Sequence, residues 1–256
     1  MTTRYIENDF LSSMYSVLHE TGHGIYEQGI GDDIAISLLG SGASMGIHES
    51  QSRFYENLIG RRRTFWEMIR SELTPYLSEA FDHVTPHLFY EAMNEVKPSL
   101  IRVESDELTY NLHIIIRYEI ERILFTEEVD VYDLPKIWNE KYEEYLGITP
   151  PTDSVGILQD IHWAMGAFGY FPTYALGSAY ATQILAHMEK DFDVEAAIAT
   201  QKFDVIKEWL KEKVHRFGST YTPNGLMEKS FGETFNADYY VRYLKEKFSK
   251  LYDLSE

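Results

Sequence analysis

The sequence predicts a mainly α-helical protein with at most a small β element near residues 98–106. Apolar residues recur at spacings of three and four over long windows, which is the period of one face of a helix. Prolines are sparse inside those windows, and the alternation of apolar and polar residues typical of a half-buried strand is rare. Because no clear linker divides the chain, we expect one helical domain over residues 1–256.

The first expected elements are two long helices separated by a glycine-rich turn region. The first helix should begin near Asn8 or Asp9, either of which is a good N-cap, and should end at Gly29. Residues 32–46 are small and rich in glycine, which predicts a turn or a short extended piece. The second long helix is expected over residues 49–77.

Most of the remaining chain should also be helical. The run SLIRV, residues 99–103, is the best strand candidate because it is brief and partly β-branched. The segment PPTDSVG, residues 150–156, is predicted to be a loop. Further helices are expected at residues 108–125, 133–146, 160–168, 174–190, 204–216 and 236–251.

The composition limits the partners and the location of the protein. Acidic side chains number 41 against 23 basic ones, and the net charge of −18 disfavours nucleic acid or an anionic membrane as a partner. The chain has no cysteine, so a metal site must use His, Asp or Glu, and a cytoplasmic location is expected. No run approaches the roughly 20 apolar residues of a membrane span, so we expect a soluble protein.

The segment HETGH, residues 19–23, is the main candidate for a chemical site. On a helix His23 lies one turn after His19 and about 40° from it around the axis, so both imidazoles can reach one tetrahedral zinc ion. Glu20 is the residue after His19 around the helix, and it can take a proton from a metal-bound water. The alternative is that HExxH arose by chance and that the histidines are partly buried helix residues.

A catalytic zinc held by two histidines needs a third protein ligand and an open position for water. The extended metzincin pattern would require Gly and His farther along, where this chain has Tyr26 and Gly29, so that class is excluded. Glu49 is the favoured third ligand because a separate helix can approach the metal from the side. Glu27, one turn beyond His23, is the alternative ligand, and it could instead bond to a ligand histidine or face solvent.

Four segments closely resemble, in order and spacing, the signatures of the carboxypeptidase Taq family of thermostable carboxypeptidases. They are HETGHGIYEQG, GIHESQSRFYENLIGR, IRVESDELTYNLHIIIRYE and GILQDIHWAMGAFGYFPTYALG. The resemblance implies a largely helical fold with a deep groove, zinc or cobalt as cofactor, and release of single residues from peptide C termini. It also implies that His19, His23 and Glu49 are metal ligands and that Glu20 is the general base.

An exopeptidase must also recognise a terminal carboxylate, and a guanidinium fork can pair with both of its oxygens. Arg102, in the third signature, is our candidate, and the alternative is a surface charge on a strand. Arg117 lies inside an apolar helix, where we expect it to pair with Glu119 or Glu121 or with a neighbouring helix.

The fourth signature predicts a pocket wall that is aromatic and interrupted by glycines. A tyrosine or histidine often stabilises the oxyanion in zinc peptidases of this design, and we rank Tyr174 first and His162 second for that role. Gln159 and Tyr170 are expected to bind substrate, and Asp160 lies among them. Trp163, Phe168 and Phe171 are expected to pack in the core. Asp106 and Glu107 should cap the helix at 108, or orient ligand histidines.

The chain also departs from the family pattern. Family members carry HPF and D-x-R-x-T signatures before HExxH; nothing here matches HPF, and MTTRY looks like the tail of the second signature, with Thr2 as its threonine. The chain therefore looks like the C-terminal half of a longer metallocarboxypeptidase: a fragment, one product of a split gene, or a truncated relative. We expect it to bind zinc, to have weak or no activity alone, and to form a homodimer or associate with the missing half.

Two other functions remain open at this point. A zinc oligoendopeptidase would use the same mechanism on internal bonds. A catalytically silent helical partner module would keep the metal site as a structural relic. The four ordered signatures argue against a helical protein without any metal.

Overall fold

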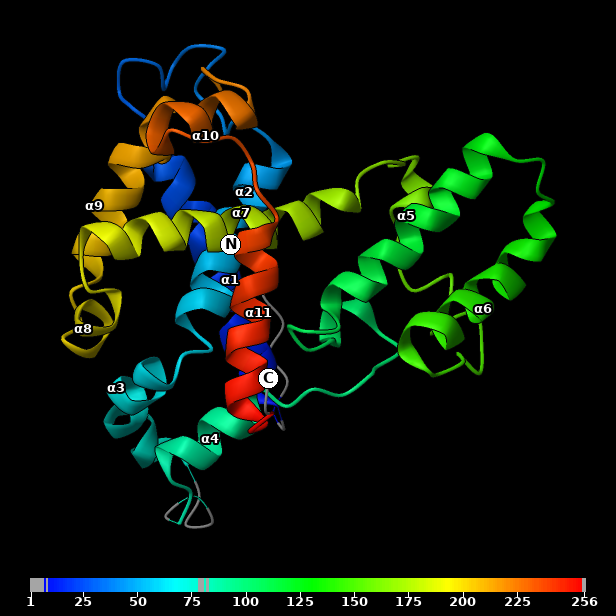
Figure 1. Cartoon of the computed structure of the whole chain (residues 1–256), viewed down its shortest axis with the longest axis horizontal. Helices are drawn as coiled ribbons and strands as arrows, with labels where there is room; N and C mark the ends of the chain where they lie inside the picture. The colour runs from blue at the N-terminus through cyan, green and yellow to red at the C-terminus, as the bar shows by residue number, and fades with distance from the viewer. Residues whose placement is uncertain (1–6, 8, 78–80, 82, 255–256) are drawn as a thin grey trace. The chain divides into compact units, whose positions relative to one another are not determined.

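The computed structural model describes residue 7, residues 9–77, residue 81 and residues 83–254, and their regular structure is helical with no strand (Figure 1). The predicted mainly α fold class is therefore confirmed. The proposed remnant of the D-x-R-x-T signature, at Met1 and Thr2, lies outside the described residues. None of the described helices combines the length and the apolar character that a membrane crossing requires.

The chain forms two compact units, which we describe separately. Unit 1 comprises residues 1–93 and 176–256, and unit 2 comprises residues 94–175. This division has no clear signal in the sequence, because neither change of unit coincides with a glycine- or proline-rich linker. That the whole chain folds as one helical domain stays a prediction.

Unit 1 begins with the predicted first helix. Helix α1 spans Phe10–Gly29, and the Asp9 side chain caps it by accepting a hydrogen bond from the backbone N–H of Ser12, as the sequence indicated. A turn region follows, as predicted, and Ser44 caps helix α2, Met45–Arg53. Because Ser44 caps the helix, α2 begins at Met45, four residues before Glu49, where the second helix was predicted to begin.

The prediction of one continuous helix over residues 49–77 is wrong. After α2 the chain continues as a π-helix, Phe54–Ile59, in which the Gly60 N–H bonds to the carbonyl of Tyr55, five residues back. Arg62 then adopts an extended conformation that ends the run, and helix α3 starts anew at Arg63–Leu73, followed by a short 3-10 turn. Periodicity alone does not separate a π turn from an α turn, so the interruption had no clear signal.

The rest of unit 1 is built from further helices of 6 to 20 residues around one hydrophobic core. The predicted helices at 174–190, 204–216 and 236–251 are confirmed in type as α7, α9 and α11, whereas α4, α8 and α10 were not predicted because each has nine residues or fewer. The core includes the fully buried Ile47, Phe54, Ile184 and Leu210. The bounds are α4 Pro86–Met93, α7 Pro172–Asp191, α8 Val194–Ala199, α9 Phe203–Lys213, α10 Pro223–Phe231 and α11 Asp238–Leu251.

Unit 2 contains a pair of packed helices, α5 over Tyr110–Thr126 and α6 over Leu134–Leu146, which lie side by side in Figure 1. Both were predicted within two residues at their ends. The stacked rings of Trp138 and Tyr142 lie between them, with Ile116 and Ile120 in the same cluster. The loop predicted at 150–156 is confirmed as a series of turns.

Two other predictions for unit 2 are wrong. The strand expected within 98–106 is a 3-10 turn, Arg102–Glu104, because the Arg102 N–H bonds to the side chain of Gln159 and not to a neighbouring strand. The helix expected at 160–168 is reduced to the 3-10 turn Trp163–Met165. Gly166 ends that turn with a positive φ of 75°, a conformation that glycine adopts without a steric penalty.

Two buried histidines predict how stability depends on pH. Burial lowers the pKa of His215, in unit 1, and of His113, in unit 2, to about 3. Each ring is therefore neutral in the fold but takes up a proton below about pH 6.5 when the chain unfolds. The free energy of unfolding should be greatest above pH 6.5 and should fall as the pH drops toward 3, by up to about 1.4 kcal/mol per pH unit for each histidine.

Urea unfolding followed by circular dichroism at pH 7.5, 6.0 and 5.0 checks this expectation. The variant His215→Gln should flatten part of the slope even if it is less stable at every pH, because the glutamine has no proton to gain. A free energy of unfolding that stays constant from pH 7.5 to 5.0 would contradict the assignment of both rings as neutral.

Candidate active site

The side chains of His19, His23 and Glu49 converge in unit 1. The two histidines lie one turn apart on α1, with ring centroids 4.9 Å apart and ring planes at 80°. From α2, Glu49 places its Oε2 atom 3.7 Å from His19 Nε2 and 3.6 Å from His23 Nε2. The three ligand-type atoms all lie within 4.8 Å of one another, and in the described part of the chain this is the group that could hold a metal ion.

Two glycines allow this convergence. A Cβ atom at Gly22 of α1 would lie 2.3 Å from the carbonyl oxygen of Gln51, so only glycine lets α2 approach this closely beside the two histidines. A Cβ atom at Gly177 of α7 would lie 2.5 Å from Glu49 Cγ. The glutamate is thus enclosed between helices, with 5% of its surface exposed.

A carboxylate of the π-helix orients the first histidine. Glu56 Oε2 lies 2.8 Å from His19 Nδ1, so this nitrogen donates its proton to the carboxylate, and in the neutral ring Nε2 then carries the lone pair that a metal would take. Arg53 bridges the two acids, donating to Glu49 Oε1 at 2.9 Å and to Glu56 Oε2 at 3.2 Å. The π-helix therefore presents Glu56 to the ligand group.

The charges of this group shift its pKa values in consistent directions. Burial alone would raise the pKa of Glu56, but Arg53 and the hydrogen bond from His19 outweigh it and hold that pKa at about 2. Burial also acts to raise the pKa of Glu49. Arg53 and the two histidines outweigh it, so the pKa of Glu49 is lowered. The pKa of His19 is raised because Glu56 and Glu49 outweigh the effect of its burial. Both carboxylates are therefore ionised at neutral pH.

His48 orients the ring of His23. His23 Nδ1 lies 2.6 Å from His48 Nδ1, and His48 Nε2 lies 2.8 Å from Glu27 Oε1. In the consistent proton arrangement His48 donates from Nε2 to Glu27 and accepts at Nδ1 from His23, which leaves His23 Nε2 unprotonated. Glu27 is about half exposed and lies outside the convergent group. It contacts a ligand-type histidine only through His48.

The donor set fits a divalent cation. Two imidazole nitrogens and one carboxylate oxygen form one of the donor sets of catalytic zinc sites, and each ring uses its remaining nitrogen in a hydrogen bond that favours one tautomer. Glu20 follows His19 on α1 and is half-buried. Sequence reasoning missed Arg53, Glu56 and His48, although His48 precedes Glu49 directly and Arg53 lies one helical turn beyond it.

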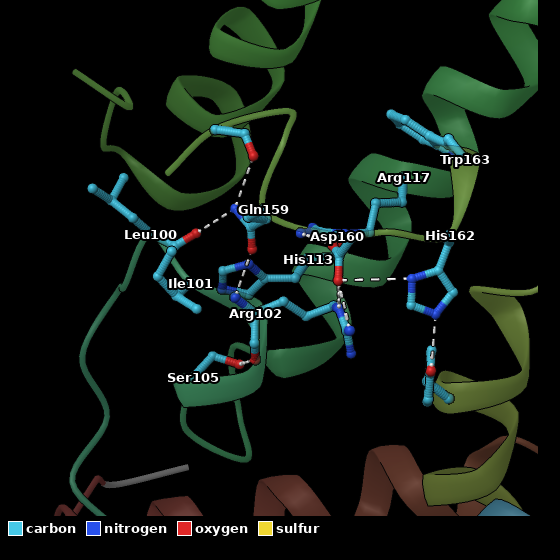
Figure 2. Close-up of polar contacts among 12 residues, drawn as sticks. Leu100, Ile101, Arg102, Ser105, His113, Arg117, Gln159, Asp160, His162 and Trp163 are labelled. Carbon is cyan, nitrogen blue, oxygen red and sulfur yellow. Dashed lines mark hydrogen bonds and ion pairs between the residues drawn. The ribbon is translucent and has the colours of Figure 1, made fainter. Parts of the chain in front are cut away.

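The predicted residues of the third and fourth signatures gather in unit 2 around Asp160 (Figure 2). Arg102 donates from Nη2 to Asp160 Oδ1 at 2.7 Å, and Arg117 donates from Nε to Asp160 Oδ2 at 2.7 Å. Burial opposes the ionisation of Asp160, but the two guanidiniums outweigh it and keep its pKa below the usual value. Arg102 is 6% exposed, so the alternative of a surface charge on a strand is wrong.

Of the three alternatives for Arg117, the neighbouring helix is confirmed, since Arg117 donates to the Tyr142 hydroxyl of α6 at 3.3 Å, whereas the pairing with Glu119 or Glu121 is wrong. Glu119 bonds to Lys141 and Tyr145 instead, each at 2.7 Å. Glu121 accepts hydrogen bonds from the Trp163 indole at 2.7 Å and the Gly169 N–H at 3.0 Å. Both acids therefore serve other partners of unit 2.

The oxyanion candidates lie next to each other in the same cluster. His162 Nε2 is 3.0 Å from the Tyr174 hydroxyl, and the ring of Tyr170 lies 5.5 Å from the His162 ring. The Arg102 guanidinium lies 4.8 Å from the centroid of the Tyr174 ring. Burial and the charge of Arg102 lower the pKa of His162, so its ring is neutral at pH 7. Tyr174, His162, Tyr170 and Arg102 are thus neighbours.

The remaining candidates have structural contacts within unit 2. Gln159 accepts from the Arg102 N–H at 2.9 Å and donates to the Leu100 carbonyl at 3.0 Å, so its amide ties two loop segments together. A substrate-binding role for Gln159 stays a prediction. Asp106 Oδ1 accepts from the backbone N–H groups of Leu108 and Thr109, each at 2.9 Å, so it closes the turn that leads into α5, whose own N-cap residue, Thr109, makes no side-chain cap bond.

Comparison with known proteins places this chain in a family. Residues 1–248 match the model of the carboxypeptidase Taq (M32) metallopeptidase family. The chain belongs to the carboxypeptidase Taq family. It is 51% identical to carboxypeptidase 1 of Bacillus subtilis, covering 98% of this chain and 50% of that protein, and 46% identical to thermostable carboxypeptidase 1 of Pyrococcus furiosus, covering 97% and 50%.

Solved structures of the carboxypeptidase Taq family share this fold. The M32 carboxypeptidase from Deinococcus radiodurans R1 superimposes with a TM-score of 0.95 at 41% identity, covering 99% of this chain and 51% of that one. The crystal structure of BsuCP gives a TM-score of 0.93 at 50% identity, covering 98% and 50%. The chain spans about half the length of the curated relatives that it matches.

The enclosure of Glu49 gives a test of the ligand group. The variant Gly177→Ala should weaken zinc binding by about tenfold or more, because its Cβ must displace the Glu49 side chain and perturbed support of a ligand typically costs that much. Gly46→Ala is the matched control, since its Cβ would meet its nearest neighbour, Leu176, at an ordinary 3.6 Å. Competition titration with a chromophoric chelator measures both affinities; equal affinities would contradict the role of Gly177.

Proposed function

We propose that this chain carries the metal centre of a zinc carboxypeptidase, which removes single residues from the C termini of peptides. The observation that carries this proposal is the convergence of His19, His23 and Glu49 in a chain of the carboxypeptidase Taq (M32) metallopeptidase family. The proposed ligands are His19 Nε2, His23 Nε2 and Glu49 Oε2. We propose zinc because two imidazoles and one carboxylate are a donor set of catalytic zinc sites. Cobalt could bind to the same three ligands.

A divalent cation held by these ligands supplies Lewis acidity, which lowers the pKa of a water and polarises the scissile carbonyl. In the proposed mechanism Glu20 accepts the proton of the attacking water and passes it to the leaving amine. Glu56 and His48 hold the two imidazoles in the tautomer that ligation requires. Arg53 keeps Glu49 ionised, so the group as a whole remains ready for a cation.

The polar cluster of unit 2 supplies the proposed substrate contacts. Two guanidiniums share the single carboxylate of Asp160, and this leaves one positive charge to attract a substrate carboxylate. We assign that recognition to Arg102, which lies against Tyr174, and propose Gln159 and Tyr170 as its neighbours in substrate binding. Tyr174, or His162 in second place, would donate a hydrogen bond to the developing oxyanion.

Other features of the function also remain proposals. Half of each relative's length has no counterpart in this sequence, and we propose that the chain alone has weak or no peptidase activity. A homodimer, or association with a separate N-terminal half, would then complete the groove. A cytoplasmic location is proposed on the absence of cysteine.

Paired carboxylate variants test the metal assignment. Purified chain should bind one zinc ion per molecule, and Glu49→Gln should lose it because an amide is a much weaker ligand than a carboxylate. Glu27→Gln, which removes the charge of the alternative ligand, should retain the ion, as should Glu20→Gln. Atomic emission analysis of metal content after gel filtration measures this. Retention in Glu49→Gln together with loss in Glu27→Gln would reverse the assignment.

Peptide cleavage tests the reaction class. With zinc present, an N-blocked dipeptide that has a free C terminus should be cleaved slowly by the chain alone, and that cleavage should vanish in Glu20→Gln. An internally quenched peptide with an amidated C terminus should stay intact. Cleavage of the amidated peptide would favour the oligoendopeptidase, and no cleavage of either substrate with zinc bound would favour the silent partner module. Rapid release of the C-terminal residue would contradict the proposed weakness of the isolated chain.

A further inference from the structure

Unit 1 contains a cavity of about 630 Å³ that none of the residues discussed above as ligands or bases reaches. Its walls come from the start of α3, from α4, from Glu195 on α8 and from the last turns of α11. Figure 1 shows α4 beside the C-terminal end of α11. The cavity therefore joins four segments that are far apart in the sequence.

The lining of this cavity is basic, although the chain as a whole is acidic. Five side chains with a permanent positive charge line it, together with His87, whereas only two lining residues are acids, Glu195 and Glu246. The whole chain carries a net charge of −18. A concave surface that concentrates positive charge raises the local concentration of anions. The five cations are Arg61, Arg62, Arg63, Lys247 and Lys250.

Two of these cations form a fixed wall. Arg62 donates to Glu189 at 2.9 Å, to Glu195 at 2.5 Å and to the Leu58 carbonyl at 2.6 Å, so it serves mainly to hold α7 and α8 against the start of α3. Arg61 donates to the Met93 carbonyl at 2.7 Å, and its guanidinium carbon lies 4.2 Å from the centroid of the Tyr15 ring. Their positions are set before any ligand arrives.

The other three cations are Arg63, Lys247 and Lys250, of which Lys247 also donates to the Tyr243 hydroxyl at 3.3 Å. Arg63 is more than half exposed and uses its Nε atom to pair with Glu67 at 2.7 Å. Lys247 and Lys250 lie three residues apart on α11 and so share one face of that helix. Lys250 forms no ion pair or hydrogen bond with the described part of the chain. Charges from α3 and α11 thus face one space.

We propose that this cavity binds the phosphate groups of a phosphorylated small molecule. A single carboxylate can pair with one guanidinium. An anion with several charges and several oxygen acceptors, such as a chain of phosphates, can contact cations on separate helices at the same time. The start of α3 adds to this, because its first turn contains no acid and no side chain caps it. The assignment is independent of the proposed peptidase activity.

The same chemistry could come from inorganic polyphosphate or from a nucleotide. Tyr90 and Tyr243 also line the cavity, and their rings offer faces on which a base could stack. Glu246 could accept a hydrogen bond from a sugar hydroxyl. A triphosphate with and without a nucleoside therefore distinguishes the two sources.

Calorimetric titration of the 256-residue chain with inorganic tripolyphosphate tests the proposal. The protein is first stripped of metal with a chelator and dialysed, so that metal chelation by the phosphate cannot imitate binding. We expect one site per chain, weakened by added salt because ion contacts carry the affinity. The double variant Arg63→Ala, Lys250→Ala should bind at least about tenfold more weakly, since it removes two charged donors.

The matched control is Lys136→Ala, Lys245→Ala, which changes the net charge equally but alters exposed lysines of α6 and α11 outside the cavity; it should bind like the parent chain. Tighter binding of adenosine triphosphate than of tripolyphosphate supports a nucleotide, and equal binding supports the phosphate chain alone. No binding at about 1 mM tripolyphosphate, corresponding to less than about 4 kcal/mol, overturns the proposal. So does equal binding by the two double variants, or binding of hexaglutamate but not of tripolyphosphate.

Discussion

The close approach of α1 and α2 at Gly22 is the constraint on which the candidate metal centre depends. The carbonyl of Gln51 occupies the space that any larger residue at position 22 would need. This contact brings Glu49 to within 4 Å of both histidine rings, although 26 residues separate it from His23. Because Gly22 lies inside HETGH itself, the segment that supplies two ligands also provides the space through which the third arrives.

The charges around this contact are matched to a cation. Two buried carboxylates and one guanidinium leave the group one negative charge in excess, which a divalent ion would more than neutralise. Glu56 reaches the site from a π-helix, whose wider turn replaces the α-helix that the sequence pattern suggested. A structural irregularity at a functional site is common, since positioning a side chain there outweighs the cost of less regular hydrogen bonding.

Much of the fold and of this centre could be predicted from the sequence. The long helices have clear apolar periods, and His19, His23 and Glu49 were each identified because helix geometry fixes the spacing of the first two and a family signature marks the third. The supporting residues were not found. Glu56 and His48 act through tertiary contacts between helices, and a single sequence gives no measure of which polar residues of a helix face a neighbour. Arg53 contacts Glu49 and Glu56 locally, one turn away on each side, but the role of Glu56 was not apparent from the sequence.

The errors in unit 2 have the same origin. Arg102 looked like a strand residue because its neighbours are β-branched, yet its backbone is held by Gln159, 57 residues away. Arg117 was expected to pair with acids on its own helix or with a neighbouring helix. It does contact Tyr142 of α6, but its ion pair is with Asp160, in a loop that only the fold brings near. Local patterns predict elements well but do not predict which loop closes over which helix.

The most direct test of the central claim is a crystal structure of the zinc-loaded chain with anomalous scattering at the zinc edge. Our account predicts one strong peak bonded to His19 Nε2, His23 Nε2 and Glu49 Oε2, each at about 2.0–2.2 Å. A zinc ion bound instead through His48 or Glu27, or no ion between the two histidines of α1, would contradict it.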